Sequence, residues 1–149
     1  MSAHPNAVAV DDQLCFQLYA TSRAVSGAYR AGLADLGLTY PQYVTLLAVL
    51  EQDGRTVSEL CDVLDLDSGT VSPILGRLQG EGLVTKVREG ADGRTVRIFC
   101  TEAGADLGQQ VAPVRASVEN ATGLSSAEFA QLRGLLQQVR RNLKDSSPE

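Results

Sequence analysis

The sequence predicts a mainly α-helical chain with one small β-hairpin, in the order helix, helix, helix, helix, hairpin, helix, helix. Apolar residues recur at helical spacing over most of the chain, but the period changes to two in "TVRIFC", where Val96, Ile98 and Cys100 alternate. A turn rich in Gly and Asp, "REGADGR", joins this stretch to "LVTKV", so the two form a hairpin. The length suits one domain over residues 1–149.

Two helices are expected before the centre of the chain. Apolar residues at helical spacing, among them Leu14 and Val25, predict a first helix over about residues 12–35, which the glycine of "LGL" ends. Pro41 suits the first position of the next helix, with Thr39 or Tyr40 before it.

The central segment reads as helix, turn, helix and then a two-stranded wing. "VSELCDVLDL" follows Thr56 as one helix, and "SGTVSPILGRLQGEGL" follows as another, with Asp67 or Ser68 as its N-cap. Pro73 lies in the second turn of that helix and removes a backbone hydrogen bond, so we expect a kink or an irregular first turn. Residues 41–100 are therefore predicted to be a winged helix-turn-helix core.

The C-terminal part predicts two more helices. Thr101 caps the first, Pro113 should kink it and Gly123 ends it. Ser125 and Glu128 form a capping box for the last helix. Its apolar residues recur in steps of three and four: Phe129, Leu132, Leu136, Val139 and Leu143.

Such a stripe is what an interhelical contact requires. We therefore expect residues 12–38 and 101–144 to supply the dimerisation helices of a homodimer.

Composition excludes several classes of protein. No apolar run reaches the ~18 residues of a membrane span, and the N-terminus does not have the pattern of a secretory signal, so we expect a cytoplasmic protein without membrane contact. Three cysteines without a CxxC motif argue against a disulfide scaffold or a zinc site. The single histidine, His4, lies in the N-terminal tail, which argues against a Ser–His or Cys–His pair. We expect no enzyme, no cofactor and no metal.

Positive charge is concentrated on the second helix of the predicted helix-turn-helix and on the wing. The whole chain, with 13 basic and 18 acidic residues, has a net charge of −5. Residues 76–97 carry five basic and three acidic side chains, a local +2, which leaves −7 for the rest. The second helix of a helix-turn-helix enters the major groove of double-stranded DNA. Candidate contacts are its hydroxyl and basic residues together with the wing: Ser68, Thr70, Ser72, Arg77, Arg88 and Arg94, with Asp92 able to orient Arg94.

The chain resembles the MarR family of winged-helix repressors, and within it the organic-hydroperoxide regulators. "LCFQLYATSRA" together with "LTYPQY" carries the more specific part of this resemblance, which extends from about Leu14 to Ala103. The resemblance implies a homodimer that represses a peroxide-detoxification gene, and it implies that Cys15 senses organic hydroperoxides. It also implies that Tyr29 and Tyr40 hydrogen-bond the Cys15 thiolate, and it adds Asp67 to the DNA contacts.

Helix geometry bears on that thiol independently. Tyr29 follows Cys15 by 14 residues, or ~21 Å along a straight helix, so the two meet only if the chain folds back or a second subunit supplies the phenol. Phenol donors and the helix N-terminus both stabilise a thiolate, the species that attacks a peroxide. Tyr19, one turn from Cys15, either joins this site or simply packs.

Alternatives remain at this stage. A free cysteine is most often a small apolar filler, so the chain is alternatively a MarR-type regulator of a phenolic or other small ligand, with Cys15 structural. A thiol peroxidase is a third candidate. Cys61 and Cys100 lie on apolar faces and are expected in the core. The "VRASVENATG" segment has no second, resolving cysteine, so the resemblance is to the one-cysteine type. Its oxidised thiol either takes a low-molecular-weight thiol or over-oxidises, and Cys100 is a resolving partner without support from the sequence.

Overall fold

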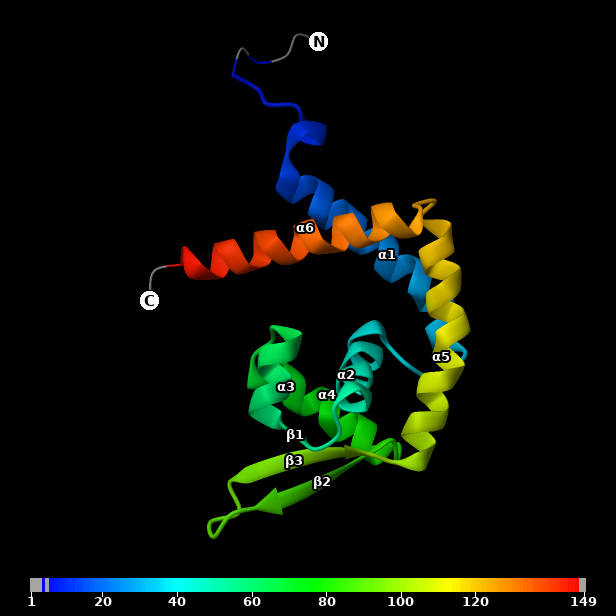
Figure 1. The fold of residues 1–149 in the computed structure, drawn as a ribbon, viewed down its shortest axis with the longest axis vertical. Coiled ribbons are helices and arrows are strands. Elements are labelled where there is room, and N and C mark those ends of the chain that lie inside the picture. The colour runs from blue at the N-terminus through cyan, green and yellow to red at the C-terminus, as the bar shows by residue number, and fades with distance from the viewer. Residues whose placement is uncertain (1–3, 5, 148–149) are drawn as a thin grey trace. The chain divides into compact units, whose positions relative to one another are not determined.

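The computed structural model describes residue 4 and residues 6–147, and within them the chain forms six α-helices and a three-stranded antiparallel sheet (Figure 1). A short 3-10 turn at Val10–Asp12 precedes the first helix. The elements are α1 (Leu14–Ala34), α2 (Tyr40–Glu51), β1 (Arg55–Thr56), α3 (Val57–Leu64), α4 (Ser68–Gly80), β2 (Val84–Glu89), β3 (Thr95–Cys100), α5 (Glu102–Ala121) and α6 (Ser126–Asp145). The predicted fold class is confirmed.

The sheet is larger by one strand than the sequence predicted. The hairpin of β2 and β3 is antiparallel, with Val84 opposite Cys100 and Glu89 opposite Thr95. β1 adds only two residues on the other edge of β3, where Arg55 pairs with Ile98, and the strand order is β1-β3-β2. Two residues give no period-two pattern, and for this reason the sequence predicted a two-stranded wing.

Local capping signals explain where the helices begin. Three helices begin with a capping box. In each, the cap side chain accepts from the backbone N–H three residues on, and the side chain of that later residue accepts from the backbone N–H of the cap. The caps are Thr39, Thr56 and Ser125. For α6, the Ser125 Oγ and Glu128 N atoms lie 3.2 Å apart, so the predicted capping box is confirmed.

α4 runs as one element from Ser68 to Gly80, with Pro73 inside it. Pro73 is exposed, so water can satisfy the carbonyl whose intrahelical partner the proline removes. Three side chains on the opposite side, Val71, Leu75 and Leu78, are fully buried and hold the helix against the core.

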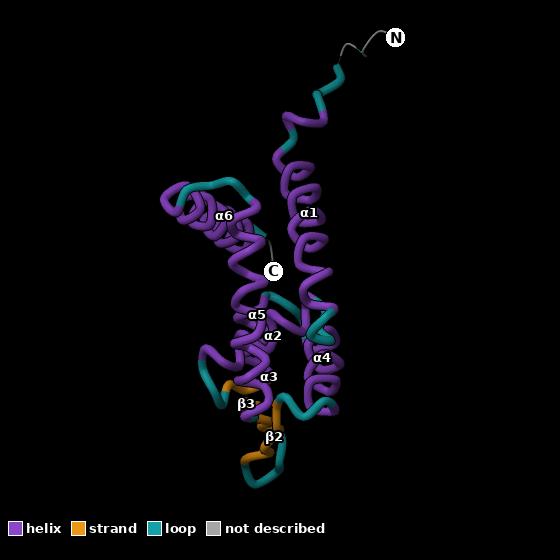
Figure 2. The backbone as a smooth tube through the Cα atoms, turned by 90° about the vertical axis from the view of Figure 1, so that its right-hand side faces the viewer, coloured by secondary structure: helices purple, strands orange, loops and turns teal. Residues whose placement is uncertain are grey.

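The chain divides into two compact units, the first ending at Arg115 and the second beginning at Ala116. In the first unit, α2 packs against α1, α3 and α4, and the hairpin projects beyond the helices (Figures 1 and 2). Its core contains fully buried side chains from five elements: Leu33, Leu46, Leu60, Leu75 and Ile98. The assignment of residues 12–38 and 101–144 as dimerisation helices of a single 1–149 domain stays a prediction.

α6, in the second unit, has no buried side chain. Its leucines at 132, 135, 136 and 143 are all exposed. Among the described residues, no helix combines the length and the apolar character needed to cross a bilayer.

Candidate functional site

Cys15 is the second residue of α1 and is exposed. Gln13, at the N-cap, makes no side-chain capping bond, so the amides of the first turn lack that partner. Gln17 Nε2 donates to the Asp11 carbonyl at 3.0 Å and ties the preceding turn to the helix. The thiol therefore lies in the electropositive first turn of a helix, open to solvent.

Tyr19, one turn beyond Cys15, is also exposed, and the Arg23 guanidinium carbon lies 5.6 Å from the centre of its ring. This cation–π contact orients the Tyr19 ring along the surface of α1. Tyr19 therefore lies on the same helix face as the thiol. Its ring contacts Arg23, whereas the ring contacts described below join Tyr29, Tyr40 and Tyr43.

Tyr29 and Tyr40, the two phenols that the family resemblance assigns to the Cys15 site, lie next to each other. Tyr29 lies late in α1 and Tyr40 begins α2, and their ring centres are 5.2 Å apart at an interplanar angle of 54°. Tyr29 is buried, whereas Tyr40 remains 37% exposed, so the pair reaches the surface through Tyr40.

A third ring, that of Tyr43, completes this group, which we call the tyrosine cluster (Tyr29, Tyr40 and Tyr43). Its centre lies 5.7 Å from that of Tyr29, in a stacked arrangement, and 6.0 Å from that of Tyr40, edge-on. Sequence reasoning missed Tyr43. The available signal was its spacing of three from Tyr40 directly after Pro41, which fixes the register of the first helical turn.

The environment keeps Tyr40 in its protonated form. Burial raises the pKa of the Tyr40 phenol above its usual value, and the neighbouring Tyr43 raises this pKa further. A phenol that retains its proton is a hydrogen-bond donor, and donation is what an anionic sulfur needs.

Within one chain, Cys15 and the tyrosine cluster lie apart. α1 is unbroken between Cys15 and Tyr29, so 14 residues at the helical rise separate them by ~21 Å. The structure thus brings Tyr29 and Tyr40 together and leaves Cys15 at the far end of the same helix.

The other two cysteines are partly buried. The Cys100 thiol donates to the Thr101 carbonyl at 3.3 Å, and its backbone N–H donates to Asp53 Oδ1 at 2.7 Å. Burial raises the pKa of this thiol, and the charge of Asp53 adds to the effect. Cys100 therefore resists forming the thiolate that redox chemistry requires.

The candidate DNA-reading residues of α4 are exposed; most lie in its first turns, whereas Arg77 lies in its last turn. Asp67 is the N-cap, and its Oδ1 accepts from the Thr70 backbone N–H at 2.8 Å and from the Thr70 hydroxyl at 3.0 Å. Asp67 thus positions Thr70 and starts the recognition helix. The other candidates on α4, Ser68, Ser72 and Arg77, are exposed.

The wing presents Arg94 to solvent. Its side chain is 87% exposed, and its Nε lies 3.4 Å from Asp92 Oδ2, so Asp92 does orient the guanidinium as predicted. Arg88 is held differently, because its Nη1 donates to the Gly93 carbonyl across the turn at 3.3 Å. Arg97, on the same hairpin, is tied to Glu89 at 2.7 Å and to the Gly54 carbonyl at 2.9 Å.

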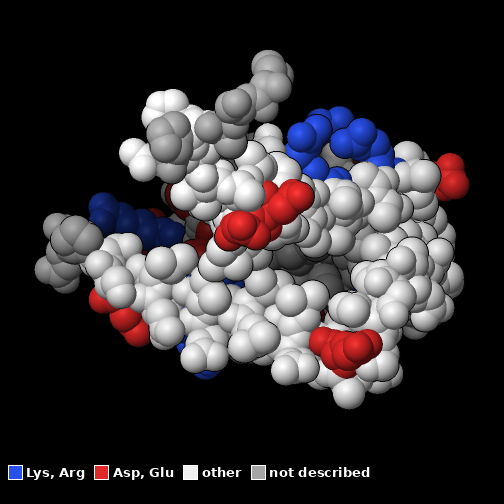
Figure 3. All heavy atoms as spheres, turned by 90° about the horizontal axis from the view of Figure 1, so that it is seen from above, with Lys and Arg blue, Asp and Glu red and all other residues white. Residues whose placement is uncertain are grey.

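The face shown in Figure 3 is mostly uncharged, with basic and acidic side chains in separate small groups. Because the net charge of the chain is −5, attraction for DNA depends on local features such as Arg94.

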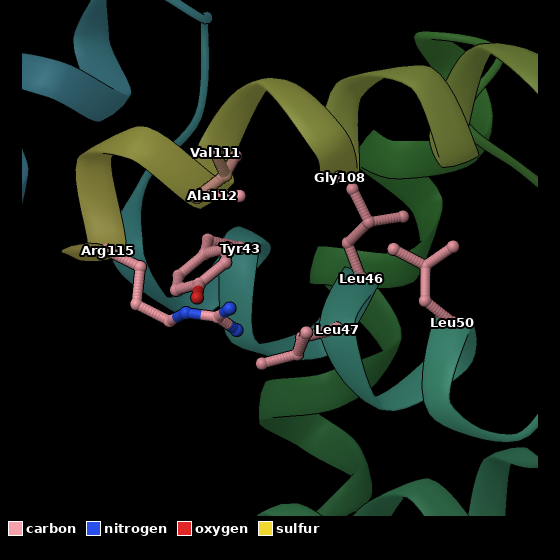
Figure 4. A pocket seen from close by; sticks show the side chains of 8 residues that line it. All are labelled: Tyr43, Leu46, Leu47, Leu50, Gly108, Val111, Ala112 and Arg115. Carbon is pink, nitrogen blue, oxygen red and sulfur yellow. The ribbon is translucent and has the colours of Figure 1, made fainter.

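A small pocket lies between α2 and α5, with a volume of about 60 Å³. Tyr43 and Arg115 extend toward each other at one side of it, among apolar side chains such as Leu47 and Val111 (Figure 4). A cavity that binds benzene measures about 150 Å³, so this pocket is too small for a phenolic ligand.

Taken together, a helix-turn-helix with an exposed recognition helix and a wing with an exposed arginine at its tip define a winged-helix DNA-binding protein. The MarR family profile matches residues 36–95. The chain is 40% identical over 134 residues to the HTH-type transcriptional regulator TtmR of Methylorubrum extorquens, covering 90% of this chain and 69% of the relative. The chain belongs to the MarR family of transcriptional regulators.

Two further likenesses bear on the site. The chain is 38% identical over 127 residues to the organic hydroperoxide resistance transcriptional regulator of Bacillus subtilis, covering 85% of this chain and 86% of that one. The solved structure of reduced AbfR bound to DNA matches with a TM-score of 0.72 and 30% identity, covering 91% of this chain and 94% of that one.

A higher TM-score, 0.81, is found with BpsR of Bordetella bronchiseptica. Its identity is 23%, with 91% of this chain and 98% of that one covered, and it shows the shared fold alone.

Proposed function

We propose that this MarR-family regulator is a homodimeric repressor that leaves its operator when organic hydroperoxides oxidise Cys15. The observation that carries the proposal is the pairing of Tyr29 with Tyr40 at 5.2 Å, in a chain whose exposed thiol lies at the other end of the same helix. The relative from Bacillus subtilis, named for organic hydroperoxide resistance, supports the choice of signal.

The separation along α1 supports a site shared by two copies. A thiol and a phenol that lie ~21 Å apart in one straight helix meet when two α1 helices cross in opposite directions. In that arrangement Cys15 of each copy approaches Tyr29 and Tyr40 of the other. Exposed apolar side chains near the thiol, Leu14, Phe16 and Leu18, gain burial from the same contact.

The chemistry follows from a thiolate held by phenol donors. The sulfur attacks the terminal oxygen of the hydroperoxide, an S–O bond forms, the O–O bond breaks, and the alkoxide leaves and takes up a proton as an alcohol. Cys15 becomes a sulfenic acid, and the added oxygen disrupts the hydrogen bonds to Tyr29 and Tyr40.

A low-molecular-weight thiol then condenses with the sulfenic acid to give a mixed disulfide and water.

Release from DNA follows from geometry. A dimer presents its two recognition helices to half-sites ~34–36 Å apart. Loss of the contacts between Cys15 and the phenols changes how the subunits meet, and the two helices no longer match the half-sites together. The proposal includes a cytoplasmic location, since the operator lies there.

A band-shift assay with the chain's own upstream DNA tests the proposal. The wild-type protein should bind the operator when reduced and lose it after treatment with organic hydroperoxide, whereas Cys15→Ser should bind and stay bound. Cys61→Ser is the matched control and should release like the wild type. Release of Cys15→Ser by hydroperoxide would refute the sensing role.

The same material separates the rival functions. Release of Cys15→Ser by an added phenol, with no response to peroxide in the wild type, would favour a ligand-responsive regulator. Steady consumption of peroxide with a thiol reductant would favour a thiol peroxidase. Under the proposal, each Cys15 reacts once per reduction, so peroxide loss should stop near one equivalent per chain when no reductant is present.

A further inference from the structure

We propose that Tyr43 is a positioning residue for the sensing site, because its ring fixes the orientation in which Tyr29 and Tyr40 meet the thiolate. The inference rests on the proposed function, in which those two phenols donate to Cys15 of a second copy. Tyr43 itself is not expected to touch the sulfur.

The three rings of the tyrosine cluster form a closed triangle. Tyr43 stacks on Tyr29 with an interplanar angle of 29° and meets Tyr40 nearly edge-on at 63°. Offset-stacked and edge-on pairs at 4.5–7 Å are the favoured arrangements of aromatic side chains. Removing the Tyr43 ring therefore removes one of two ring contacts from each proposed donor.

Tyr43 can serve as the fixed member because its own position is strongly constrained. Its backbone N–H donates to the Thr39 carbonyl at 3.0 Å, in a helical turn that Pro41 and the capping box of Thr39 set. The side chain is 6% exposed, against 37% for Tyr40.

The pocket on the other side of Tyr43 gives the cluster room to move if the ring is lost. Tyr43 lines this pocket together with Leu47 and Arg115 (Figure 4). Without the planar ring, the space it occupied joins the existing cavity, and the Tyr29 ring can turn into it. Hydrogen bonds weaken steeply as their angle falls, so a turned phenol donates poorly to a sulfur held elsewhere.

The test measures how fast Cys15 reacts with iodoacetamide across pH, in the full-length protein. Mass spectrometry of the Cys15 peptide separates this thiol from Cys61 and Cys100. In Tyr43→Leu, the pH of half-maximal Cys15 reactivity should rise by about one unit, a roughly tenfold loss of thiolate at neutral pH. Tyr43→Phe keeps the ring and should restore the wild-type profile.

The matched control is Leu47→Ala, which enlarges the same pocket from the same helix without removing a ring. Its Cys15 profile should stay within about 0.2 pH units of the wild type, a shift small against the full unit expected above. A wild-type profile in Tyr43→Leu would overturn the inference. So would a Tyr43→Phe protein that behaves like Tyr43→Leu, because the effect would then belong to the hydroxyl.

Tyr40→Phe distinguishes this inference from the proposed function. If Tyr40→Phe raises the Cys15 midpoint and Tyr43→Leu does not, only the positioning role fails. If Tyr40→Phe also leaves the profile unchanged, the thiolate–phenol contact itself is wrong. Should Tyr43→Leu fail to fold, Tyr43→Met fills a similar volume without a planar ring and gives the same test.

Discussion

At the scale of single residues, the environments of Cys15 and Cys100 point to opposite chemistry. Cys15 is exposed in the first turn of a helix, where unpaired amides favour an anion. Cys100 is partly buried and lies beside the Asp53 carboxylate, and both features raise its thiol pKa. Cys100 therefore keeps its proton, whereas Cys15 is open to solvent and to reagents.

This contrast predicts different alkylation rates. Iodoacetamide reacts with thiolates, and a raised pKa lowers the thiolate fraction at any pH below that pKa. At pH 8, Cys100 should therefore react more slowly than the exposed Cys15, because its raised pKa leaves less thiolate and its partial burial limits access. Quantitative mass spectrometry of the two peptides measures the rates.

The control for this prediction is the protein in denaturant, where the three cysteines should react at similar rates because folding no longer separates them. Equal rates for Cys15 and Cys100 in the folded protein would show that the burial of Cys100 does not protect it. Cys100 would then be a candidate resolving thiol.

The tyrosines show what the sequence could predict at this scale. Tyr29 and Tyr40 were expected to share a site, on the strength of the family resemblance. Tyr43 was missed because its role depends on contacts between two helices, which spacing within "LTYPQY" does not define. Whether Cys15 joins these rings depends on a second copy, so neither the sequence nor the single chain determines it.

At the scale of elements, Arg94 and Arg97 of the wing have different tasks. Arg97 is tied to Glu89 and to the Gly54 carbonyl and stabilises the hairpin from within. Arg94 projects from the turn with only Asp92 beside it. An extended arginine on a narrow hairpin suits the minor groove, where the potential is negative.

Arg94→Ala should therefore lower operator affinity by about tenfold, which is ~1.4 kcal/mol. The slope of log affinity against log salt concentration should shrink by about two, because the homodimer loses one DNA-facing charge from each of its two wings. Fluorescence anisotropy at several salt concentrations measures both quantities.

Arg97→Ala is the paired control on the same hairpin. It should lower the melting temperature but leave the salt slope unchanged, since its guanidinium is already engaged within the protein. A salt slope that changes in Arg97→Ala and not in Arg94→Ala would reverse the two assignments.

The joint between the wing and α5 depends on a glycine. Thr101 donates from its backbone to the Leu83 carbonyl at 3.1 Å and from its hydroxyl to the Gly82 carbonyl at 2.6 Å, which draws α5 onto the start of β2. A Cβ at Gly104 would overlap the Leu83 carbonyl and lie 2.8 Å from Cys100 Sγ.

Gly104→Ala should destabilise the protein by about 1–3 kcal/mol, because the obstacle is backbone and cannot rotate away. Thermal unfolding at fixed protein concentration measures the loss. Gly76→Ala, in α4, is the control, since a Cβ there meets nothing within 4 Å and should stabilise by about 0.4–1 kcal/mol. A melting temperature unchanged by Gly104→Ala would mean that β2 and α5 move apart easily.

The sequence predicted the start of a helix correctly where the capping residues lie close together in the chain. The capping boxes at Thr56 and Ser125 depend on residues three apart, and both helices begin where these pairs place them. β1 was not predicted, because its two residues are a strand only through pairing with β3, more than 40 residues later. The continuity of α4 through Pro73 likewise depends on core contacts on its other side.

At the scale of the whole molecule, apolar side chains remain uncovered on two helices. α1 exposes Leu14, Phe16 and Leu18 near the thiol, and α6 exposes its regularly spaced leucines. From their apolar spacing, the sequence predicted both helices as dimerisation helices. A single chain leaves them in water, and the partner that covers them, under the proposed function, is a second copy.

Charge on the α6 stripe should therefore separate the subunits. Leu132 and Leu136 are exposed and lie on one helix face, and each Leu buried at an interface contributes about 1.5–3 kcal/mol. In sedimentation experiments, the double variant Leu132→Glu, Leu136→Glu should have a mass near the 15.8 kDa of one chain, whereas the wild type should have about twice that mass.

Because one recognition helix holds only one half-site, the same variant should bind the full operator at least about 100-fold more weakly, as expected when two linked binding events become one. Gln138→Glu adds one negative charge, half that of the double variant, on the opposite face of α6 and should remain dimeric with wild-type affinity. A double variant that stays dimeric would place the subunit contact elsewhere. If the wild type sediments as one chain and still binds the full operator, the protein acts without a second copy. Cys15 could then not contact Tyr29 and Tyr40 of another chain, and the proposed sensing site would be wrong.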